Sequence, residues 1–203
     1  MAEKVRKLGR PRSARSENAI LNATMEILVE RGYGGLTTDE VVARASASKA
    51  TIYRRWPSKE LLAVAAVDRL PELTPVDKGT IELDLLGIVT EFADFVQNTP
   101  LGTVWPMMLG ERTRSPELRA ALDSSTDRRR APTRLVLRRA MDRGELPADL
   151  DIELAVDLIM GPVILRLMFE DAVISEEEFQ KIIHVALKGL GRQYSEDSAP
   201  LID

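Results

Sequence analysis

The stretch ASASKATIYRRWPSKELL, residues 45–62, carries two consecutive helix signals around a cluster of cations and aromatic side chains. Residues 48–55 contain no helix breaker, and Pro57 ends the segment that they form. Ser58 is a favourable N-cap residue for the next helix, which the pattern extends to about residue 70. The stretch therefore predicts two helices separated by a tight break, with Tyr, two Arg and Trp near the end of the first.

A helix-turn-helix is predicted here, because another short helix precedes residue 48. A Thr-x-x-Glu capping box predicts a helix over residues 37–45, and a turn of about three residues separates it from the helix over 48–55. Two flanking helices, predicted over 14–31 and 58–70, would supply the small core that such a unit needs. In this motif the second helix enters the DNA major groove with its N-terminal residues on base edges.

The side chains of the second helix suit that position. Lys49 can reach a guanine edge or a phosphate, Ala50 permits close approach, and Thr51 offers a hydroxyl and a methyl group. Arg54 lies where a helix leaving the groove meets phosphates. Lys59 lies at the start of the next helix, whose free N–H groups suit a phosphate oxygen.

A basic arm precedes the helices. Gly9-Arg10-Pro11-Arg12 looks like the core of an AT-hook, in which an extended Arg-Pro-Arg lies in the narrow minor groove of A·T-rich DNA. The alternative is an ordinary solvated basic terminus. Residues 1–57 carry 11 Lys and Arg against 6 Asp and Glu, whereas residues 58–203 carry 17 against 26. A basic head on an acidic body favours a polyanionic partner for the head.

The composition argues against catalysis. The chain has 203 residues, 44% of them hydrophobic, with no Cys and one His, and it lacks a Gly-rich phosphate loop and a nucleophile elbow. We therefore expect no enzyme, no metal and no cofactor. The basic start lacks the apolar segment of a signal peptide, and the longest apolar run, residues 158–165, is too short to span a bilayer. A cytoplasmic location is expected.

The rest of the chain also predicts helices. A loop rich in Pro and Gly after residue 70 suggests two domains, residues 1–70 and 71–203. Prolines predict a break near Trp105-Pro106 and kinks at Pro132 and Pro162. No strand pattern competes, so the expected fold is all-α with about nine helices. The further helices are predicted over residues 80–98, 100–112, 116–141, 151–169 and 175–190.

These motifs resemble the tetracycline repressor (TetR) family of bacterial transcription regulators. Over residues 15–62 the resemblance rests on AILNAT, RGYGGLTTDEVVARA and SKATIYRRWPSKELL, the last of which resembles the signature of one subgroup. Residues 145–169, ELPADLDIELAVDLIMGPVILRLMF, resemble its penultimate helix. The resemblance implies a homodimer whose heads bind half-sites of a palindromic operator and whose body binds a small molecule. The family usually has Gly and a larger apolar residue in the turn, where this chain has Ser46 and Ala47.

The resemblance also implies a phosphate contact for the Tyr53 hydroxyl, whereas Ile52 and Trp56 are assigned to the core of the head. The candidate DNA-binding residues are Arg10, Arg12, Thr37, Ser48, Lys49, Ala50, Thr51, Tyr53, Arg54 and Lys59.

The apolar pattern of residues 71–203 predicts a pocket and a dimer interface. Large apolar residues on four predicted elements suit an apolar effector, although an ordinary core is the alternative for each of them. The last two helices carry more apolar surface than one body needs, which predicts a four-helix interface between two chains. The predicted pocket comprises Phe92, Phe95, Trp105, Met107, Met108, Met160, Ile164, Leu167 and Met168. The predicted interface comprises Ile159, Val163, Phe179, Ile182, Ile183, Ala186, Leu187 and Leu190.

Together these features predict a ligand-responsive transcriptional regulator. A repressor that a small hydrophobic effector releases from its operator is favoured. The expected partners are double-stranded operator DNA, that effector and a second copy of the chain. The alternatives are a TetR-like activator and a helical protein-binding scaffold dimer that does not bind DNA.

Overall fold

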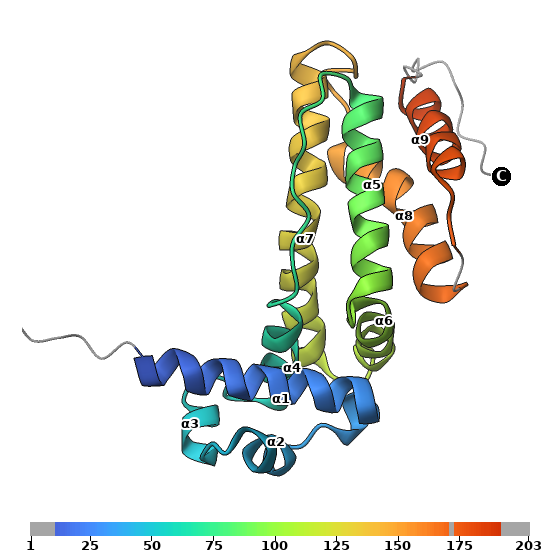
Figure 1. Ribbon diagram of the computed structural model, residues 1–203. Helices are drawn as coiled ribbons and strands as arrows, with labels where there is room; N and C mark the ends of the chain where they lie inside the picture. The colour runs from blue at the N-terminus through green and yellow to red at the C-terminus, as the bar shows by residue number, and fades with distance from the viewer. Residues whose placement is uncertain (1–10, 171–172, 192–203) are drawn as a thin grey trace, which may run out of the picture. The chain divides into compact units, whose positions relative to one another are not determined.

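The computed structural model describes residues 11–170 and 173–191, and within these residues the chain forms nine α-helices and no strand (Figure 1). The predicted all-α fold is therefore confirmed. The helices are α1 (Pro11–Gly35), α2 (Thr38–Ala45), α3 (Lys49–Tyr53), α4 (Lys59–Val67), α5 (Ile81–Asn98), α6 (Leu101–Glu111), α7 (Pro116–Asp142), α8 (Ile152–Phe169) and α9 (Glu176–Leu190).

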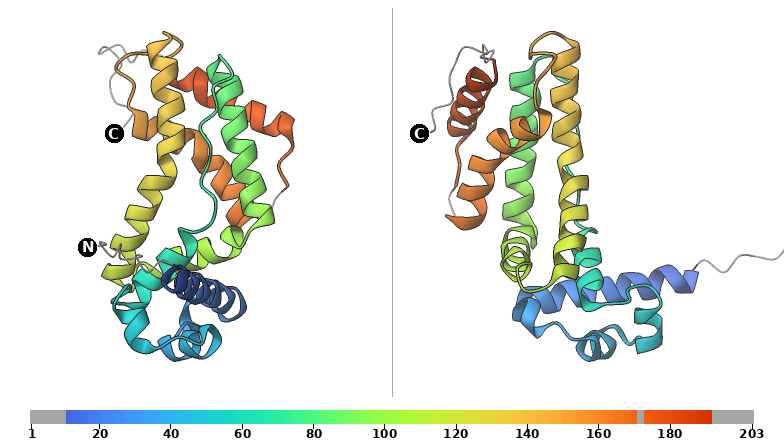
Figure 2. Two further views of the ribbon diagram at one scale, coloured as in Figure 1. Left: turned by 60° about the vertical axis from the view of Figure 1, so that its left-hand side comes forward. Right: turned by 180° about the vertical axis from the view of Figure 1, so that it is seen from behind.

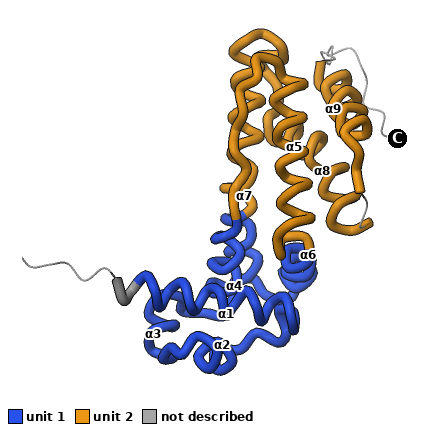
Figure 3. Tube along the Cα trace, viewed as in Figure 1, with its two compact units in different colours: residues 1–70, 103–125 blue, residues 71–102, 126–203 orange. Residues whose placement is uncertain are grey.

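The chain divides into two compact units (Figure 3). Unit 1 comprises residues 1–70 and 103–125, and unit 2 comprises residues 71–102 and 126–203. The break after residue 70 falls where the sequence suggests a seam. Residues 103–125, however, group with the first unit, although the sequence assigns them to the second domain. Helices α6 and α7 each contribute residues to both units.

Unit 1 has its core along α1, on which α2 and α4 both pack (Figure 2). Ile20 and Ile27, two turns apart on α1, are fully buried, as are Val41 of α2 and Val67 of α4. Burial of such side chains stabilises a fold by about 1.5 to 3 kcal/mol each. The short helices α2 and α3 therefore take their stability from packing and not from helix propensity, because isolated helices of this length are marginal in water.

The end of α1 is fixed by a glycine and a methionine. Gly32 has a φ of 71° and a ψ of 179°, which interrupts the helical backbone where the sequence predicts a stop. A Cβ at Gly32 would lie 2.9 Å from Sδ of Met107 in α6. The backbone N–H of the next residue, Tyr33, donates to the same sulfur at 3.2 Å. Only glycine combines this dihedral with this close approach.

The turn between α2 and α3 contains the departure from the family pattern. Ser46 has a φ of 49° and a ψ of 41° and is the C-cap of α2, with its N–H donated to the carbonyl of Val42. Among the described residues it is the only non-glycine with a positive φ. The turn thus keeps the left-handed geometry that glycine would adopt without strain.

Unit 2 is built from α5, α8 and α9, each of which packs on the other two, with the C-terminal part of α7. Its core side chains include Ile88 of α5, Ile159 and Val163 of α8, and Phe179 and Ile183 of α9, all at most 4% exposed. The apolar stripe of α9 predicted from the sequence therefore faces the interior of its own unit.

Hydrogen bonds hold the segment before α5 to the rest of unit 2. The N–H of Lys78 donates to Oδ1 of Asp84 at 2.5 Å, and the N–H of Ile81 donates to Oε2 of Glu145 at 2.6 Å. Asp84 is fully buried and also accepts from Nη2 of Arg143 at 3.1 Å. A buried carboxylate is tolerated because these donors satisfy it.

Three helices continue through a proline. The break predicted near Trp105-Pro106 is absent, because α6 extends from Leu101 to Glu111 with Pro106 inside it. Helices α7 and α8 likewise run through Pro132 and Pro162. Each proline removes one backbone hydrogen bond, and packing of the flanking turns holds the helix together. None of the helices in the described part of the chain is long and apolar enough to cross a membrane.

Candidate functional site

The first turn of α3 presents a row of small polar side chains. Ser48 is the N-cap, and its Oγ accepts from the N–H of Thr51 at 3.2 Å and lies 2.9 Å from the Thr51 hydroxyl. Lys49 and Ala50 are exposed on this turn. Ile52 is only 1% exposed and anchors the opposite side of the helix in the core of unit 1. The predicted division of α3 into an exposed polar face and a buried apolar face is present in the structure.

The two aromatic residues of the opening stretch have different surroundings. Tyr53 is 48% exposed, and its hydroxyl donates to Oγ1 of Thr38 at 3.2 Å. Trp56 is buried at 9% exposure, as expected for a core residue. The Tyr53 contact joins the end of α3 to the start of α2, so the exposed surfaces of both helices are held together.

A carboxylate that the sequence does not single out lies on the same surface. Oδ1 of Asp39, in the first turn of α2, is 2.5 Å from Nζ of Lys49, and both side chains are more than half exposed. The hydrogen bond to Asp39 raises the pKa of Lys49, which keeps its ammonium charged. In this structure Lys49, the first cation of α3, is therefore paired with a carboxylate of the same chain.

Lys59, the first residue of α4, is positioned by Tyr33 of α1. Ser58 caps this helix by accepting from the N–H of Leu61 at 3.2 Å. Nζ of Lys59 lies 4.3 Å from the ring centroid of Tyr33, a cation–π arrangement. The Tyr33 hydroxyl donates to Oε1 of Glu60 at 2.9 Å. Burial raises the pKa of Tyr33, and this hydrogen bond raises it further.

Most of the predicted DNA-binding residues that follow the basic arm come together. Thr37 is the exposed N-cap of α2 and accepts from the N–H of Glu40 at 3.2 Å, close in sequence to Thr38 and Asp39. Arg10 lies outside the described residues. Arg12 lies in α1, which begins at Pro11, so the Pro-Arg step is helical and not extended as an AT-hook requires. The minor-groove contact of the arm stays a prediction.

Sequence reasoning missed Thr38 and Asp39 as parts of this surface, and it missed the buried Tyr33 that lies under Lys59. A weak signal existed for Asp39, because it follows the predicted N-cap Thr37 and therefore lies in the first turn of a helix of the helix-turn-helix. Its ion pair with Lys49 depends on how α2 and α3 pack, and residue spacing alone does not give that arrangement.

The predicted effector-pocket residues divide between the two units. Trp105, Met107 and Met108 belong to unit 1. Met108 is fully buried, and Met107 accepts the Tyr33 N–H, so these side chains have structural contacts of their own. The other six residues lie in unit 2, on α5 and α8, which pack on each other, and they are buried or half-buried: Phe92, Phe95, Met160, Ile164, Leu167 and Met168.

The predicted dimer residues are mostly buried within one chain. Ile159 and Val163 have no exposed surface, and Phe179, Ile183, Ala186 and Leu190 are at most 9% exposed. Ile182 and Leu187 alone are half-buried. A buried side chain has little surface to offer a partner, so the dimer role of these residues stays a prediction. The exposed apolar side chains of these helices are Leu154, Leu158, Leu165, Phe169 and Val185, between 44% and 70% exposed.

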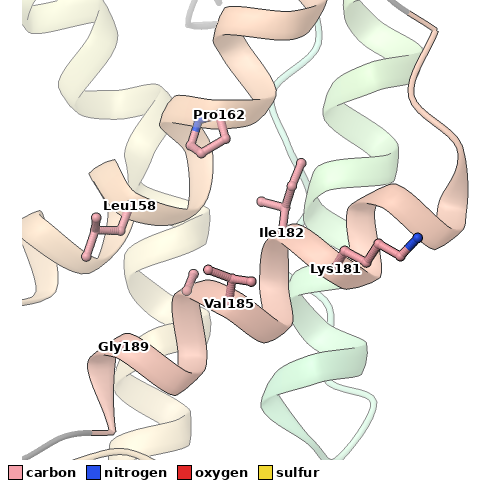
Figure 4. A pocket seen from close by; sticks show the side chains of 7 residues that line it. Leu158, Pro162, Lys181, Ile182, Val185 and Gly189 are labelled. Carbon is pink, nitrogen blue, oxygen red and sulfur yellow. The ribbon is translucent and has the colours of Figure 1, made fainter.

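Part of this exposed apolar surface forms a hollow of about 410 Å³ between α8 and α9 (Figure 4). Leu158 and Pro162 contribute from α8, and Ile182 and Val185 from α9. A second hollow of about 510 Å³ lies beside α5 and has a polar lining that includes Lys78 and Glu91. None of the predicted effector-pocket residues lines either hollow.

The helix-turn-helix, with polar and cationic side chains on the exposed face of its second helix, is of the kind found in DNA-binding transcription regulators. Comparison with family profiles agrees. The profile described as "Bacterial regulatory proteins, tetR family" matches residues 20–66, and that described as "Tetracyclin repressor-like, C-terminal domain" matches residues 75–186. The chain belongs to the TetR family of bacterial transcription regulators.

Individual relatives agree with this assignment. The chain is 32% identical over 190 residues to the Bacillus subtilis protein "Uncharacterized HTH-type transcriptional regulator YdeS", covering 91% of this chain and 94% of the relative. It is 32% identical over 157 residues to the "DNA-binding transcriptional repressor TetR" of Mycobacteroides abscessus, covering 74% and 78%. These relatives are regulators and not enzymes, and the chain is likewise a transcriptional regulator.

Solved structures show the same fold. A crystal structure of the "TetR family transcription regulator SCO0332" superposes with a TM-score of 0.68 at 28% identity, covering 86% of this chain and 98% of that one. "Salmonella enterica GusR" superposes with a TM-score of 0.66 at 21% identity, covering 92% and 99%. Regulators of this family bind operator DNA and small-molecule effectors and work as dimers.

Proposed function

We propose that this chain is a repressor that binds a palindromic operator as a dimer and leaves it when a small apolar molecule binds. The observation that carries the proposal is the exposed surface built by α3 and the first turn of α2. Ser48, Lys49, Ala50 and Thr51 would face bases, whereas Tyr53 and Arg54 would contact phosphates. Lys59, at the start of α4, would add a phosphate contact.

The SKATIYRRWPSKELL string supports placing the chain in the subgroup with this recognition-helix signature. Its Ile52 and Trp56 are buried, whereas its polar and cationic residues remain on the outside. One short helix thus contacts its own core on one side and would contact DNA on the other. This arrangement accounts for the adjacency of aromatic and cationic residues in the sequence.

The dimer would form through the exposed apolar face of α8 and α9. Leu154, Leu158, Leu165 and Val185 lie on this face, and a second copy would cover them in an isologous four-helix interface. Gly161 and Gly189 have no atom within 4 Å of an added Cβ, which leaves space for close approach of another helix. This surface adjoins the predicted stripe, whose Ile182 and Ala186 line the same hollow.

The effector would bind among the apolar side chains of α5 and α8 in unit 2. Phe92 and Phe95 on α5 are half-buried, as are Ile164 and Met168 on α8. Flexible methionine and flat aromatic side chains adapt to apolar ligands of varied shape. A thermal-shift screen with aromatic and aliphatic compounds tests this part, and a Phe92→Ala variant should lose the shift produced by any compound that binds there.

The DNA-binding claim is tested by selecting from a pool of duplexes with a randomised centre, using the full-length protein. We expect enrichment of an inverted repeat, because a symmetric dimer presents two equivalent recognition helices. Arg54→Gln should weaken binding to all enriched sequences to a similar extent, as removal of a phosphate contact does. Arg119→Gln removes the same charge from an exposed position of α7 and serves as the matched control.

Two outcomes would contradict the proposal. A pool that stays random after selection would favour the alternative of a protein-binding scaffold. Equal binding by the wild type and the Arg54→Gln variant would show that α3 is not the surface in contact with DNA. The sign of regulation is read from a reporter placed behind the enriched sequence, where a repressor lowers expression and an activator raises it.

A further inference from the structure

The DNA-facing surface contains one carboxylate that the proposed base and phosphate contacts do not use. Asp39 lies in the first turn of α2, and its Oδ1 is 2.5 Å from Nζ of Lys49, the first residue of α3. The two side chains remain 74% and 56% exposed. An ion pair between side chains as exposed as these contributes little to stability. The first turn of α2 favours an acidic residue through the helix dipole, but that effect does not require the carboxylate to lie beside Lys49.

The position of Asp39 is nevertheless fixed by its neighbours. Thr37 caps α2 just before it, and Tyr53 donates to Oγ1 of Thr38 at 3.2 Å. These contacts hold the first turn of α2 against α3, so Asp39 would move into the groove together with the recognition helix. A carboxylate so placed is repelled by phosphates, and its favourable partners in a duplex are the exocyclic amino groups of cytosine and adenine.

We propose that Asp39 is a specificity-determining residue, and that Asp39 and Lys49 together read one G·C base pair in the major groove. This inference rests on the proposed function. In a G·C pair the guanine N7 and O6 acceptors lie side by side, and the cytosine N4 amino donor follows them. An ammonium and a carboxylate 2.5 Å apart match that order of two acceptors and one donor. An A·T pair places its donor between two acceptors and adds a methyl group, which matches poorly.

Lys49 supports this arrangement through its charge. Its hydrogen bond with Asp39 raises its pKa, so it stays protonated beside the carboxylate. The pair carries no net charge, so it adds selectivity for a base pair and little to the attraction for phosphates. Removal of the Asp39 carboxylate should therefore strengthen binding to random DNA while it weakens the choice among sequences.

The test compares the wild type, Asp39→Ala and Asp39→Asn on duplexes selected by the full-length wild-type protein. The probe is the enriched duplex and its copy with the G·C pair of each half-site changed to A·T. We expect the wild type to bind the G·C duplex about tenfold more tightly than the A·T copy. Asp39→Ala should bind both equally, and Asp39→Asn should prefer the A·T copy, because an amide pairs with adenine N6 and N7.

The control is Glu26→Gln, which removes one negative charge from an exposed position of α1 and should keep the wild-type preference. Circular dichroism verifies that each variant is folded. If Asp39→Ala is unfolded, the base preference of the near-isosteric Asp39→Asn decides whether Asp39 reads the base pair. If the wild type enriches no sequence, the proposed function itself fails. If it enriches a sequence and both Asp39 variants keep the same base preference, only this inference is overturned.

Discussion

Ser46 fixes the backbone at the point where α2 passes to α3. A serine with a φ of 49° is strained, because its Cβ disfavours the left-handed region. Glycine adopts this region freely but loses more entropy on folding, so the two effects partly offset each other. We expect Ser46→Gly to raise the free energy of unfolding by about 0.5 to 1 kcal/mol, measured by urea denaturation.

The control for this change is Ala43→Gly, at an exposed position in α2. Glycine in a helix costs about 1 kcal/mol, so this variant should be less stable than the wild type. If Ser46→Gly raises the free energy of unfolding and Ala43→Gly lowers it, the result supports strain at Ser46 in the turn. A decrease in stability with Ser46→Gly would show that the serine makes a compensating contact.

Glu145 is one of the residues whose charge should make the stability of unit 2 sensitive to acid. The ion pair with Arg143 and the N–H of Ile81 lower the pKa of Glu145. Its contribution is therefore present above the ordinary carboxyl pKa and disappears as the pH falls through the lowered value. Because solvent screens this exposed carboxylate, we expect Glu145→Gln to destabilise the protein by no more than about 0.5 kcal/mol near neutral pH, with a smaller difference in acid.

Urea denaturation of both proteins over a pH series measures this difference. Glu82→Gln, an exposed position in the first turn of α5, is the control and should not show the same dependence. A gap between the wild type and Glu145→Gln that stays constant as the solution is acidified would contradict the assigned role of the carboxylate.

Among the elements, α8 and α9 carry the dimer proposal. Val185 is 70% exposed and lines the apolar hollow between these helices. Val185→Arg would bury a charge in the proposed interface, which is costly without a partner. We expect this variant to sediment as a monomer where the wild type sediments as a dimer, with its helical circular dichroism unchanged.

Gln180→Arg is the matched control, since position 180 is exposed and lies on the side of α9 away from the hollow. It should remain dimeric. If Val185→Arg still sedimented as a dimer, the exposed face of α8 and α9 would not be the dimer interface.

The same two helices show what periodicity can and cannot predict. The stripe of α9 is visible in the sequence, and Phe179, Ile183 and Leu190 are buried as their spacing suggests. Helix α8 is apolar on nearly every side, so its pattern does not distinguish the face toward its own core from the face toward a partner. For this reason the sequence selects Ile159 and not Leu158 for the interface.

At the scale of the whole molecule, N-cap residues predict the order of the helices well, whereas the prolines inside α6, α7 and α8 do not end them. Thr37, Ser48 and Ser58 each cap a helix through a side chain, as their positions in the sequence indicate. Spacing does not reveal which core a helix joins, so the sequence assigns Met107 to an effector pocket although its sulfur accepts from Tyr33 in unit 1. Contacts between helices, such as that of Asp39 with Lys49, are invisible in the sequence for the same reason.

The central claim concerns the whole dimer, namely that two copies of the α3 surface bind DNA phosphates at once. The most direct measurement is the association constant K of the wild type for its enriched duplex as a function of salt concentration. We expect a straight line of log K against log salt with a steep negative slope. For Arg54→Gln we expect a slope that is shallower by about 1 for each phosphate that the protein no longer neutralises. A slope near zero, or one that Arg54→Gln leaves unchanged, would contradict the account.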